Sequence, residues 1–501
     1  MNKETNNIFS QPARKSDRTI VPKKQANKEL PKSSAEFVEG RVLTKRNLSE
    51  LNRSQTQSWI PAMSGLARVR ERAKKDPTKP FTVLMHHITP ELLKESFQNL
   101  SRRSAPGIDG TTWKVYGDSL EDHLEDLYKR LHGGGYKPRP SRRVYIPKED
   151  GTERPLSILC IEDKIVQQAL VSVLNQIYES DFLGFSYGFR PGRGQHNALD
   201  ALAYGITKRK VNWVLDLDVQ KFFDTVDHAW ILKMIQHRVK DRRVLSLIMR
   251  WIQVGFVDKE GKRIPQKVGV PQGAVISPLL ANIYLHYVFD LWSHQWRKKV
   301  SGEIIITRFA DDVVLGFQHK ADADSYLKDL HIRLGEFGLK LHPLKTKLIR
   351  FGRYALSQCK QLGVKGLETF TFLGFTHYCT VKKNGGFKLG RRTQRQRMAK
   401  QIKLIQKEMR RRMHSPVKEM LSWLRSVLLG HFNYYGVPGN INQLASFRDE
   451  IVKRLLKTLR RRSQRSKLPW DKFGPLANAF LPRPKVVHEY PEARFRAKYS
   501  R

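Results

Sequence analysis

The amino-acid sequence predicts an α+β protein, in which a mixed domain built around an antiparallel sheet precedes a small bundle of helices. Between residues 142 and 380, apolar strand-like runs and helical segments alternate irregularly and include two hairpins, which is typical of α+β domains. From residue 391 the strand signals stop and long amphipathic helical segments follow. The length of 501 residues exceeds one ordinary core, so we expect about two to four domains.

The composition indicates a partner that carries negative charge. Lys and Arg total 92 against 47 Asp and Glu, which gives a net charge of +45 and a pI near 10.3. This excess favours nucleic acid over a membrane surface, since no basic amphipathic anchor stands out. No run approaches the roughly 18 apolar residues of a membrane span, so we expect no membrane contact. The cysteines Cys160, Cys359 and Cys379 form no Cys-x-x-Cys pair, which fits the reducing cytoplasm.

The first segment of the chain, residues 1–56, predicts a disordered basic tail, because it is rich in Lys, Asn, Ser and Gln. It shows no apolar stretch of the kind found in secretory signals. Folding is expected to begin near a basic helix candidate, within an N-terminal extension at 57–140. There, Thr89 followed by Pro90 predicts the start of a helix.

The middle of the chain predicts two hairpins and a strand between them. Residues 142–158 form the first hairpin, around Lys-Glu-Asp-Gly-Thr, and a helix is expected at 162–182. The segment VNWVLDLDV, at 211–219, predicts a mostly apolar strand with acidic residues only at its end. The second hairpin, at 303–317, pairs EIIITRF with VVLGF around Ala-Asp-Asp.

The last part of the chain predicts three basic amphipathic helices. They cover about 391–413, 415–437 and 440–463, and Asn440 with Gln443 has the form of a capping box. Residues 391–501 hold 28 Lys and Arg against 7 Asp and Glu, so nearly half of the excess charge lies there. The aromatic residues of HFNYY either stack on bases or fill the bundle core, and their helical spacing favours the core.

Paired aspartates are the strongest chemical signal. Asp311 and Asp312 lie adjacent at the second hairpin turn, and like charges so placed repel unless a cation is present. Mg²⁺ commonly binds one or two carboxylates together with substrate phosphates. Asp218, at the end of its apolar strand, supplies a third carboxylate, with Asp216 as the less favoured candidate. The alternatives are a helix N-cap for Asp218 and a polar β-turn for the adjacent pair.

Two magnesium ions held about 4 Å apart stabilise the attacking and leaving oxygens of an in-line phosphoryl displacement. One ion would activate a 3′-hydroxyl and the other would hold a triphosphate, with Mn²⁺ as a substitute. This chemistry fits nucleotidyl transfer.

From about residue 60 onward the chain resembles the bacterial group II intron reverse transcriptase–maturases. The matching blocks occur in the family's order: APGIDG, YIPKEDGTERPLSI, SYGFRPGRGQHNALDAL, LDVQKFFDTVDH, GVPQGAVISPLLANIYL, RFADDVVLGF, LHPLKTKLI, FTFLGF and GHFNYYGVPGN. The resemblance implies a right-hand polymerase, with reverse transcriptase fingers and palm at 141–385. It also implies a helical thumb and maturase domain X at 386–501, in a bacterial cytoplasm.

The resemblance implies roles for individual residues around the aspartates. Asp218, Asp311 and Asp312 would be the catalytic, metal-binding carboxylates. Phe223 would block a ribose 2′-hydroxyl, unless it is a core residue beside its neighbour. Gln272 would lie against the incoming nucleotide.

Cationic residues are implied to contact phosphates. Lys148, Arg154 and, less strongly, Lys345 would hold the triphosphate, although a solvated charged hairpin is the alternative for the first two. Arg190 and Arg193 would lie near template or primer phosphates, with a structural turn containing an Arg–acid pair as the alternative. In the helical domain we expect one cationic cluster to contact RNA, with plain solvated surface as the alternative. Its members are Arg460, Arg461, Arg462 and Arg465.

The implied partners are a group II intron RNA, an RNA template with a DNA primer or target DNA, and deoxynucleoside triphosphates. The protein would be a monomer or homodimer that assists intron splicing and copies the intron into DNA during mobility. Phe309 stands where the family usually has Tyr, and Ser157 where Gly is common; we expect activity to survive both changes. The chain stops at YPEARFRAKYSR without the H-N-H endonuclease of many relatives, so we expect no self-encoded cleavage of the second DNA strand.

Two alternative functions stay open at this point. One is a domesticated relative that serves in phage defence or DNA repair. The other is an RNA-binding splicing factor without polymerase activity, against which the three intact aspartates argue. RNA-dependent RNA synthesis is disfavoured because Phe223 is large.

Overall fold

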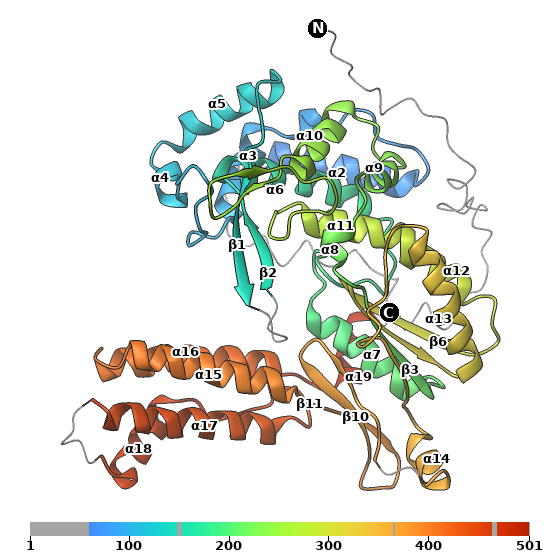
Figure 1. The fold of residues 1–501 in the computed structure, drawn as a ribbon, viewed down its shortest axis with the longest axis vertical. Coiled ribbons are helices and arrows are strands. Elements are labelled where there is room, and N and C mark those ends of the chain that lie inside the picture. Colours follow the sequence, from blue (N-terminus) through green and yellow to red (C-terminus); the bar gives the residue numbers. More distant parts are fainter. Residues whose placement is uncertain (1–59, 148–152, 364–365, 463–467, 500–501) are drawn as a thin grey trace.

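A computed structural model describes residues 60–147, 153–363, 366–462 and 468–499 (Figure 1). The predicted tail at 1–56 and the predicted phosphate ligands Lys148 and Arg465 lie outside these described residues. Three small sheets and many helices make up the described part, which confirms the α+β class. None of the described helices is long and apolar enough to cross a membrane.

The N-terminal region is a layer of helices with one hairpin. Its elements are α2 (Ile60–Lys75), η3 (Met85–His87), α3 (Pro90–Asn99), α4 (Trp113–Gly117), α5 (Leu120–His132), β1 (Ser141–Pro147), β2 (Glu153–Ile158) and α6 (Ile161–Tyr178). The side chain of Thr89 accepts a hydrogen bond from Leu92 N and caps α3, as predicted. Hairpin β1–β2 pairs antiparallel and extends away from the helices toward the C-terminal region (Figure 1).

The central region carries the sheet that the sequence predicts. Its elements are α7 (Gln195–Lys208), β3 (Trp213–Asp218), α8 (Phe222–Thr225), α9 (His228–Gln236), α10 (Arg242–Gln253), β4 (Phe256–Val257), β5 (Arg263–Ile264), α11 (Ser277–Leu285), the π-helix η4 (His286–Asp290), α12 (Leu291–Trp296), β6 (Ile304–Phe309), β7 (Asp312–Phe317), α13 (Lys320–Gly335), β8 (Lys347–Arg350) and α14 (Ala355–Gln361). The central sheet has the strand order β6-β7-β3-β8, and all its pairs are antiparallel. The short strands β4 and β5 extend the β1–β2 hairpin into a second sheet.

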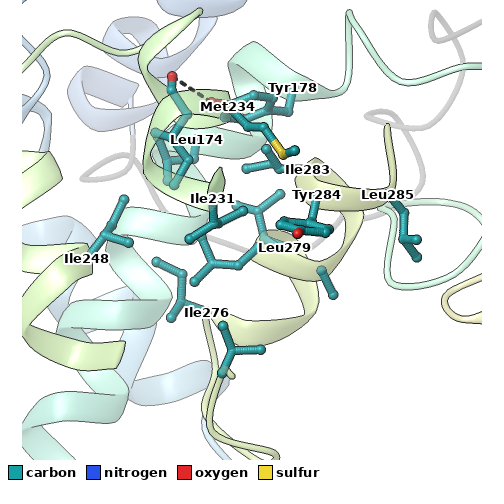
Figure 2. Close-up of a cluster of buried hydrophobic side chains, with 14 of the residues drawn as sticks. Leu174, Tyr178, Ile231, Met234, Ile248, Ile276, Leu279, Ile283, Tyr284 and Leu285 are labelled. Atoms are coloured by element: carbon teal, nitrogen blue, oxygen red, sulfur yellow. Dashed lines mark hydrogen bonds between the residues drawn. The ribbon is translucent and has the colours of Figure 1, made fainter. Parts of the chain in front are cut away.

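One large hydrophobic core joins the N-terminal helices to the central region. Figure 2 shows side chains from α6, α9, α10 and α11 converging, among them Leu174, Ile231, Ile248 and Ile283, each fully buried. Burial of this kind stabilises by roughly 25 cal/mol per Å² of apolar surface, so the elements that surround the central sheet are held together. The sheet edge that presents the carboxylates is therefore built on a rigid base.

The C-terminal region is a hairpin sheet followed by helices. Its elements are β9 (Phe370–Phe372), β10 (Phe375–Val381), β11 (Phe387–Thr393), α15 (Arg395–Arg411), α16 (Val417–Tyr435), α17 (Ile441–Arg460), α18 (Trp470–Phe480) and α19 (Pro491–Tyr499). The three predicted helices are confirmed as α15, α16 and α17, and with α18 they form the C-terminal bundle. Phe432 lies in the bundle core, as its spacing predicts.

Three further details describe how this region is connected. The boundary expected at 385/386 falls in the turn between β10 and β11, which pair along their whole length. Asn440 makes no capping hydrogen bond to α17; instead its buried amide bonds Thr393 and Tyr435 O, and so ties the bundle to the end of β11. Finally, α19 leaves the bundle and packs on α7, where Phe495 is buried.

Candidate catalytic site

The three predicted aspartates meet at one edge of the central sheet. Asp218 is the last residue of β3, Asp312 is the first residue of β7, and the two are direct partners in the strand register. Asp311 lies in the two-residue turn that joins β6 to β7. Residues directly opposite on antiparallel strands have their Cβ atoms roughly 5 Å apart, so the carboxylates face a common space.

The turn that carries Asp311 is held in an unusual backbone conformation. Ala310 has a φ of 57°, in the left-handed region that residues other than glycine rarely adopt. Such conformations persist only where the surroundings fix them, and they gather at functional sites. Here a buried hydrogen-bond network contacts the turn.

Arg308 is the centre of this network and is fully buried. Its guanidinium donates to both carboxylate oxygens of Asp290 (2.7 and 2.6 Å), to Asn282 Oδ1 (3.0 Å), to Ser186 Oγ (2.7 Å) and to Ala310 O (3.0 Å). These five bonds match the five N–H donors of an arginine. Because one of them ends on the carbonyl of Ala310, the network holds the turn that presents Asp311.

A second contact reaches the turn from the loop before α7. A Cβ atom on Gly188 would lie 2.2 Å from Ala310 N, so only glycine allows this close approach. Asn282 Nδ2 donates to Gly188 O at 2.7 Å, which fixes the same loop. The following residue, Phe189, also has a positive φ of 56°, and its exposed ring lies near that of Phe309.

The carboxylates repel one another in the metal-free protein. Asp312 as a whole is exposed, but many atoms surround its carboxyl group. The resulting loss of solvation, followed by the charges of Asp311 and Asp218, raises its pKa to about 6. Burial, followed by the charges of Asp312 and Asp218, raises the pKa of Asp216 to about 7. Burial also raises the pKa of Asp311, and Arg154 acts in the opposite direction. A cation placed among these groups would relieve the repulsion.

The donor set fits Mg²⁺, which prefers carboxylate oxygens. Among the described residues, however, no group of three or more His, Cys, Asp or Glu side chains is gathered so that it could hold a metal ion. Mg²⁺ usually keeps several waters and takes further ligands from substrate phosphates. Asp218, Asp311 and Asp312 would therefore hold the metal together with the substrate.

Three of the predicted nucleotide-binding residues surround this edge. Arg154 is exposed on β2, and its charge partly opposes the rise in the pKa of Asp311. Lys345 Nζ lies 3.9 Å from Asp218 Oδ2. Gln272 Nε2 donates to Asp224 Oδ1 at 3.2 Å, and the backbone of Gln272 accepts from Ser157 N of β2 at 2.7 Å. The loop that carries Gln272 is thus attached to hairpin β1–β2.

Phe223 lies beside the site and is only half-buried. Its neighbour Phe222 takes the core position, and the two rings meet edge to face at 5.4 Å. The backbone of Phe223 is fixed because its carbonyl accepts from Val270 N at 2.8 Å. The predicted role as a ribose gate stays a prediction, and the half-exposed ring is compatible with it.

The expectation that Arg190 contacts phosphates is wrong for this structure. Arg190 is buried and its guanidinium donates to Glu179, Leu183 O and Ser186 O. This is the structural turn with an Arg–acid pair that was the alternative. Arg193 is half-buried above Tyr187 and donates to Gly184 O at 2.5 Å, so it also supports the loop.

The arginine cluster of the C-terminal bundle is not uniform. Arg461 is exposed, as expected of a binding surface, and Arg460 is exposed while donating to Leu468 O at 2.8 Å. Arg462 is half-buried and donates to Met413 O and Ser415 O, so it joins the end of α17 to the loop between α15 and α16. For Arg462 the structure corrects the expectation of a free phosphate-binding surface.

The sequence reasoning missed Arg397 of α15. Its charge partly opposes the rise in the pKa of Asp312, and its guanidinium lies 3.0 Å from where a Cβ atom on Gly374 would be. Arg397 also hydrogen-bonds Tyr435. The C-terminal bundle therefore brings positive charge to the carboxylates. Nothing in the sequence distinguishes Arg397 from the other cations of its helix.

A sheet edge with three carboxylates and nearby cations has the groups that nucleotidyl transfer needs. The reverse transcriptase (RNA-dependent DNA polymerase) family matches residues 146–377, from the end of β1 to β10, and this range includes all three aspartates. The chain therefore contains an RNA-dependent DNA polymerase domain.

This domain is related to group II intron-encoded proteins. The chain is 32% identical over 231 residues to the group II intron-encoded protein LtrA of Lactococcus lactis. This match covers 45% of this chain and 38% of LtrA. It is also 40% identical over 230 residues to the protein YkfC of Escherichia coli. That match covers 44% of this chain and 60% of YkfC. A protein in the cob intron of Schizosaccharomyces pombe is 26% identical over 437 residues, or 74% of this chain and 53% of that protein. The matches thus span 60% or less of each of these relatives.

Proposed function

We propose that the protein copies RNA into DNA with Asp218, Asp311 and Asp312 as its metal-binding carboxylates. The observation that carries the proposal is the register of β3 with β7, which sets Asp218 opposite Asp312 beside the turn of Asp311. Two Mg²⁺ ions bound there would supply Lewis-acid stabilisation of the attacking and leaving oxygens. The aspartates hold these ions, and Ala310 with Arg308 fixes the turn that positions Asp311.

The surrounding side chains receive the nucleotide in this proposal. Arg154 and Lys345, together with Lys148, hold the triphosphate, and Gln272 lies against the incoming nucleotide. Phe223 excludes a ribose 2′-hydroxyl by its size. The division into fingers, palm and thumb follows: hairpin β1–β2 belongs to the fingers, the central sheet to the palm, and the C-terminal bundle to the thumb and domain X.

The RNA partner in this proposal is a group II intron, whose splicing the protein assists and which it copies during mobility. The net charge of +45 and the basic C-terminal bundle support RNA binding. The similarity to LtrA, a group II intron-encoded protein, supports the intron as the source. Splicing needs tight RNA binding, whereas copying also needs the carboxylates, so the two activities should separate.

The test compares Asp311→Asn with Asp324→Asn, a matched change on the exposed side of α13. Primer extension on an RNA template with Mg²⁺ should fall by roughly a thousandfold or more in Asp311→Asn, because a charge that the metal needs is lost. Asp324→Asn should extend normally, and both variants should support splicing of the intron that encodes the protein. Near-normal extension by Asp311→Asn would contradict the metal assignment. Normal extension by the unaltered protein, without splicing of the intron, would instead support the domesticated reverse transcriptase.

A further inference from the structure

A pocket of about 750 Å³ lies away from the carboxylates, where α7, hairpin β10–β11 and the start of α19 meet. Ala203, Thr207 and Lys208 line it from α7, and Tyr490, Pro491 and Glu492 line it from the C-terminal segment. None of the residues of the candidate catalytic site lines this pocket. Its volume is large enough for more than one nucleotide-sized group.

The lining of the pocket is strongly positive. Five cationic side chains line it, against one acidic side chain, Glu492: Lys208, Arg353, Lys382, Lys388 and Arg391. Lys208 pairs with Glu492 at 2.9 Å, which neutralises the acid. Lys382 and Lys388 are exposed at the hairpin, so their positive charges stay accessible to a ligand.

Arg391 gives the pocket a buried guanidinium that is not fully hydrogen-bonded. Arg391 is 4% exposed, and its Nη1 makes no hydrogen bond in the described structure. Its nearest acid is Asp200, with 3.9 Å between Nη1 and Oδ1. Asp200 is already paired through Oδ2 with Arg494 at 3.1 Å, so two guanidiniums share one carboxylate. A buried, unsatisfied donor is costly, and an anion in the pocket would relieve that cost.

Aromatic surface lies beside these cations. Tyr490 is 67% exposed, which is high for a tyrosine in a folded segment, and Phe387 lines the same pocket half-buried. Cationic side chains that follow a phosphate backbone, together with aromatic rings on which bases stack, are the usual means of binding single-stranded nucleic acid.

We propose that this pocket binds a single-stranded RNA segment outside the polymerase site, with a phosphate at Arg391 and Lys388 and a base on Tyr490. The lone acid is neutralised, which excludes a cationic ligand. The exposed aromatic ring favours a nucleotide strand over an acidic peptide, because a peptide carboxylate gains nothing from a ring face. The proposal does not depend on an intron as the source of the RNA.

The experiment measures binding of a uridine dodecamer that carries one 4-thiouridine to the full chain. The polymerase site is first saturated with an RNA–DNA hairpin that cannot be extended. The dodecamer should still bind, and its photo-crosslink should map to the peptide that contains Tyr490. Lys382→Gln/Lys388→Gln should weaken binding by roughly tenfold and lower the salt slope by about 1.4, since each single-strand phosphate contributes about 0.7.

Matched variants keep the result interpretable. Lys383→Gln/Lys360→Gln removes the same charge from exposed residues that do not line the pocket, and should bind the dodecamer normally. Tyr490→Ala should weaken binding by roughly fivefold or more, while Tyr490→Phe should restore it because the ring face returns. Primer extension on a short template should be normal in all four variants, which separates this proposal from the polymerase assignment.

Three outcomes would overturn the proposal. Equal binding by the pocket variant and its charge-matched control would show that the pocket does not hold the strand. Crosslinks confined to other peptides would place the strand elsewhere. Displacement of the dodecamer by uridine monophosphate or by a glutamate decamer at equal concentration would make the ligand a free nucleotide or an acidic protein.

Discussion

Arg308 of the central sheet and Arg461 of the C-terminal bundle are both arginines, but they have opposite surroundings. In the central region Arg308 is fully buried and all five of its donors are bonded, so it supports the catalytic turn from inside. In the bundle Arg461 is exposed to solvent and available to a polyanion. A charge count cannot tell these roles apart. Burial and hydrogen-bond partners decide which cations are structural and which can reach RNA.

The largest expected difference between the two regions is in stability. Arg308→Met leaves Asp290 buried without its partner, which should lower the free energy of unfolding by about 3–5 kcal/mol. Arg461→Met should change it by less than about 0.5 kcal/mol, because the side chain is exposed. Chemical denaturation of both variants checks the comparison, and Arg308→Met/Asp290→Leu should recover part of the loss. Equal effects of the two single substitutions would break the proposed contrast.

The next effect concerns RNA affinity. Arg460→Gln/Arg461→Gln removes two exposed charges from the bundle and should weaken RNA binding by roughly tenfold, with a shallower salt dependence. Lys298→Gln/Lys328→Gln, on exposed positions of the central region, is the matched control and should bind almost normally. Filter binding across a salt series measures both. If the control loses as much affinity, RNA contact is not concentrated on the bundle.

A smaller change is expected in sugar selection. Phe223→Ala opens space beside the nucleotide and should raise ribonucleotide relative to deoxynucleotide incorporation by roughly tenfold, the scale of one lost pocket contact. The ratio of the two kcat/KM values on one template is the measurement. Phe222→Leu, a change at the neighbouring core position, should leave the ratio unaltered. An unchanged ratio in Phe223→Ala would mean that its ring only packs.

Much of the local structure was predictable because it follows from short-range patterns. The two hairpins and the apolar strand that ends at Asp218 have periodic apolar residues and turn signals, and the structure forms them as β1–β2, β6–β7 and β3. The adjacency of Asp311 to Asp312 is in the sequence itself. That Asp218 lies beside them could be predicted only by assuming that the strands share one sheet. The pairing of β3 with β7 shows that they do.

The remaining features depend on contacts between distant parts of the chain. Arg190 looks like a surface arginine in a glycine-rich loop, and its burial follows from Glu179 and from carbonyls that only the folded loop brings near. Asn440 has the spacing of a helix cap, yet its amide bonds Thr393, 47 residues away, because the hairpin ends there. Similarly, the packing of α19 on α7 gives no periodic signal in the sequence. The apolar face of α19 is short, and the surface that it covers belongs to a distant part of the chain.

The central claim is that Asp218, Asp311 and Asp312 hold a divalent metal at the edge of the central sheet. Iron-directed cleavage tests it directly: Fe²⁺ replaces Mg²⁺, ascorbate and peroxide generate hydroxyl radicals, and the cut peptide bonds are mapped. We expect cuts near residue 218 and near 311–312, which excess Mg²⁺ suppresses and Asp311→Asn abolishes. Asp324→Asn should be cut as the unaltered protein is. Cleavage confined to other segments, or cuts at 311–312 that persist in Asp311→Asn, would contradict the claim.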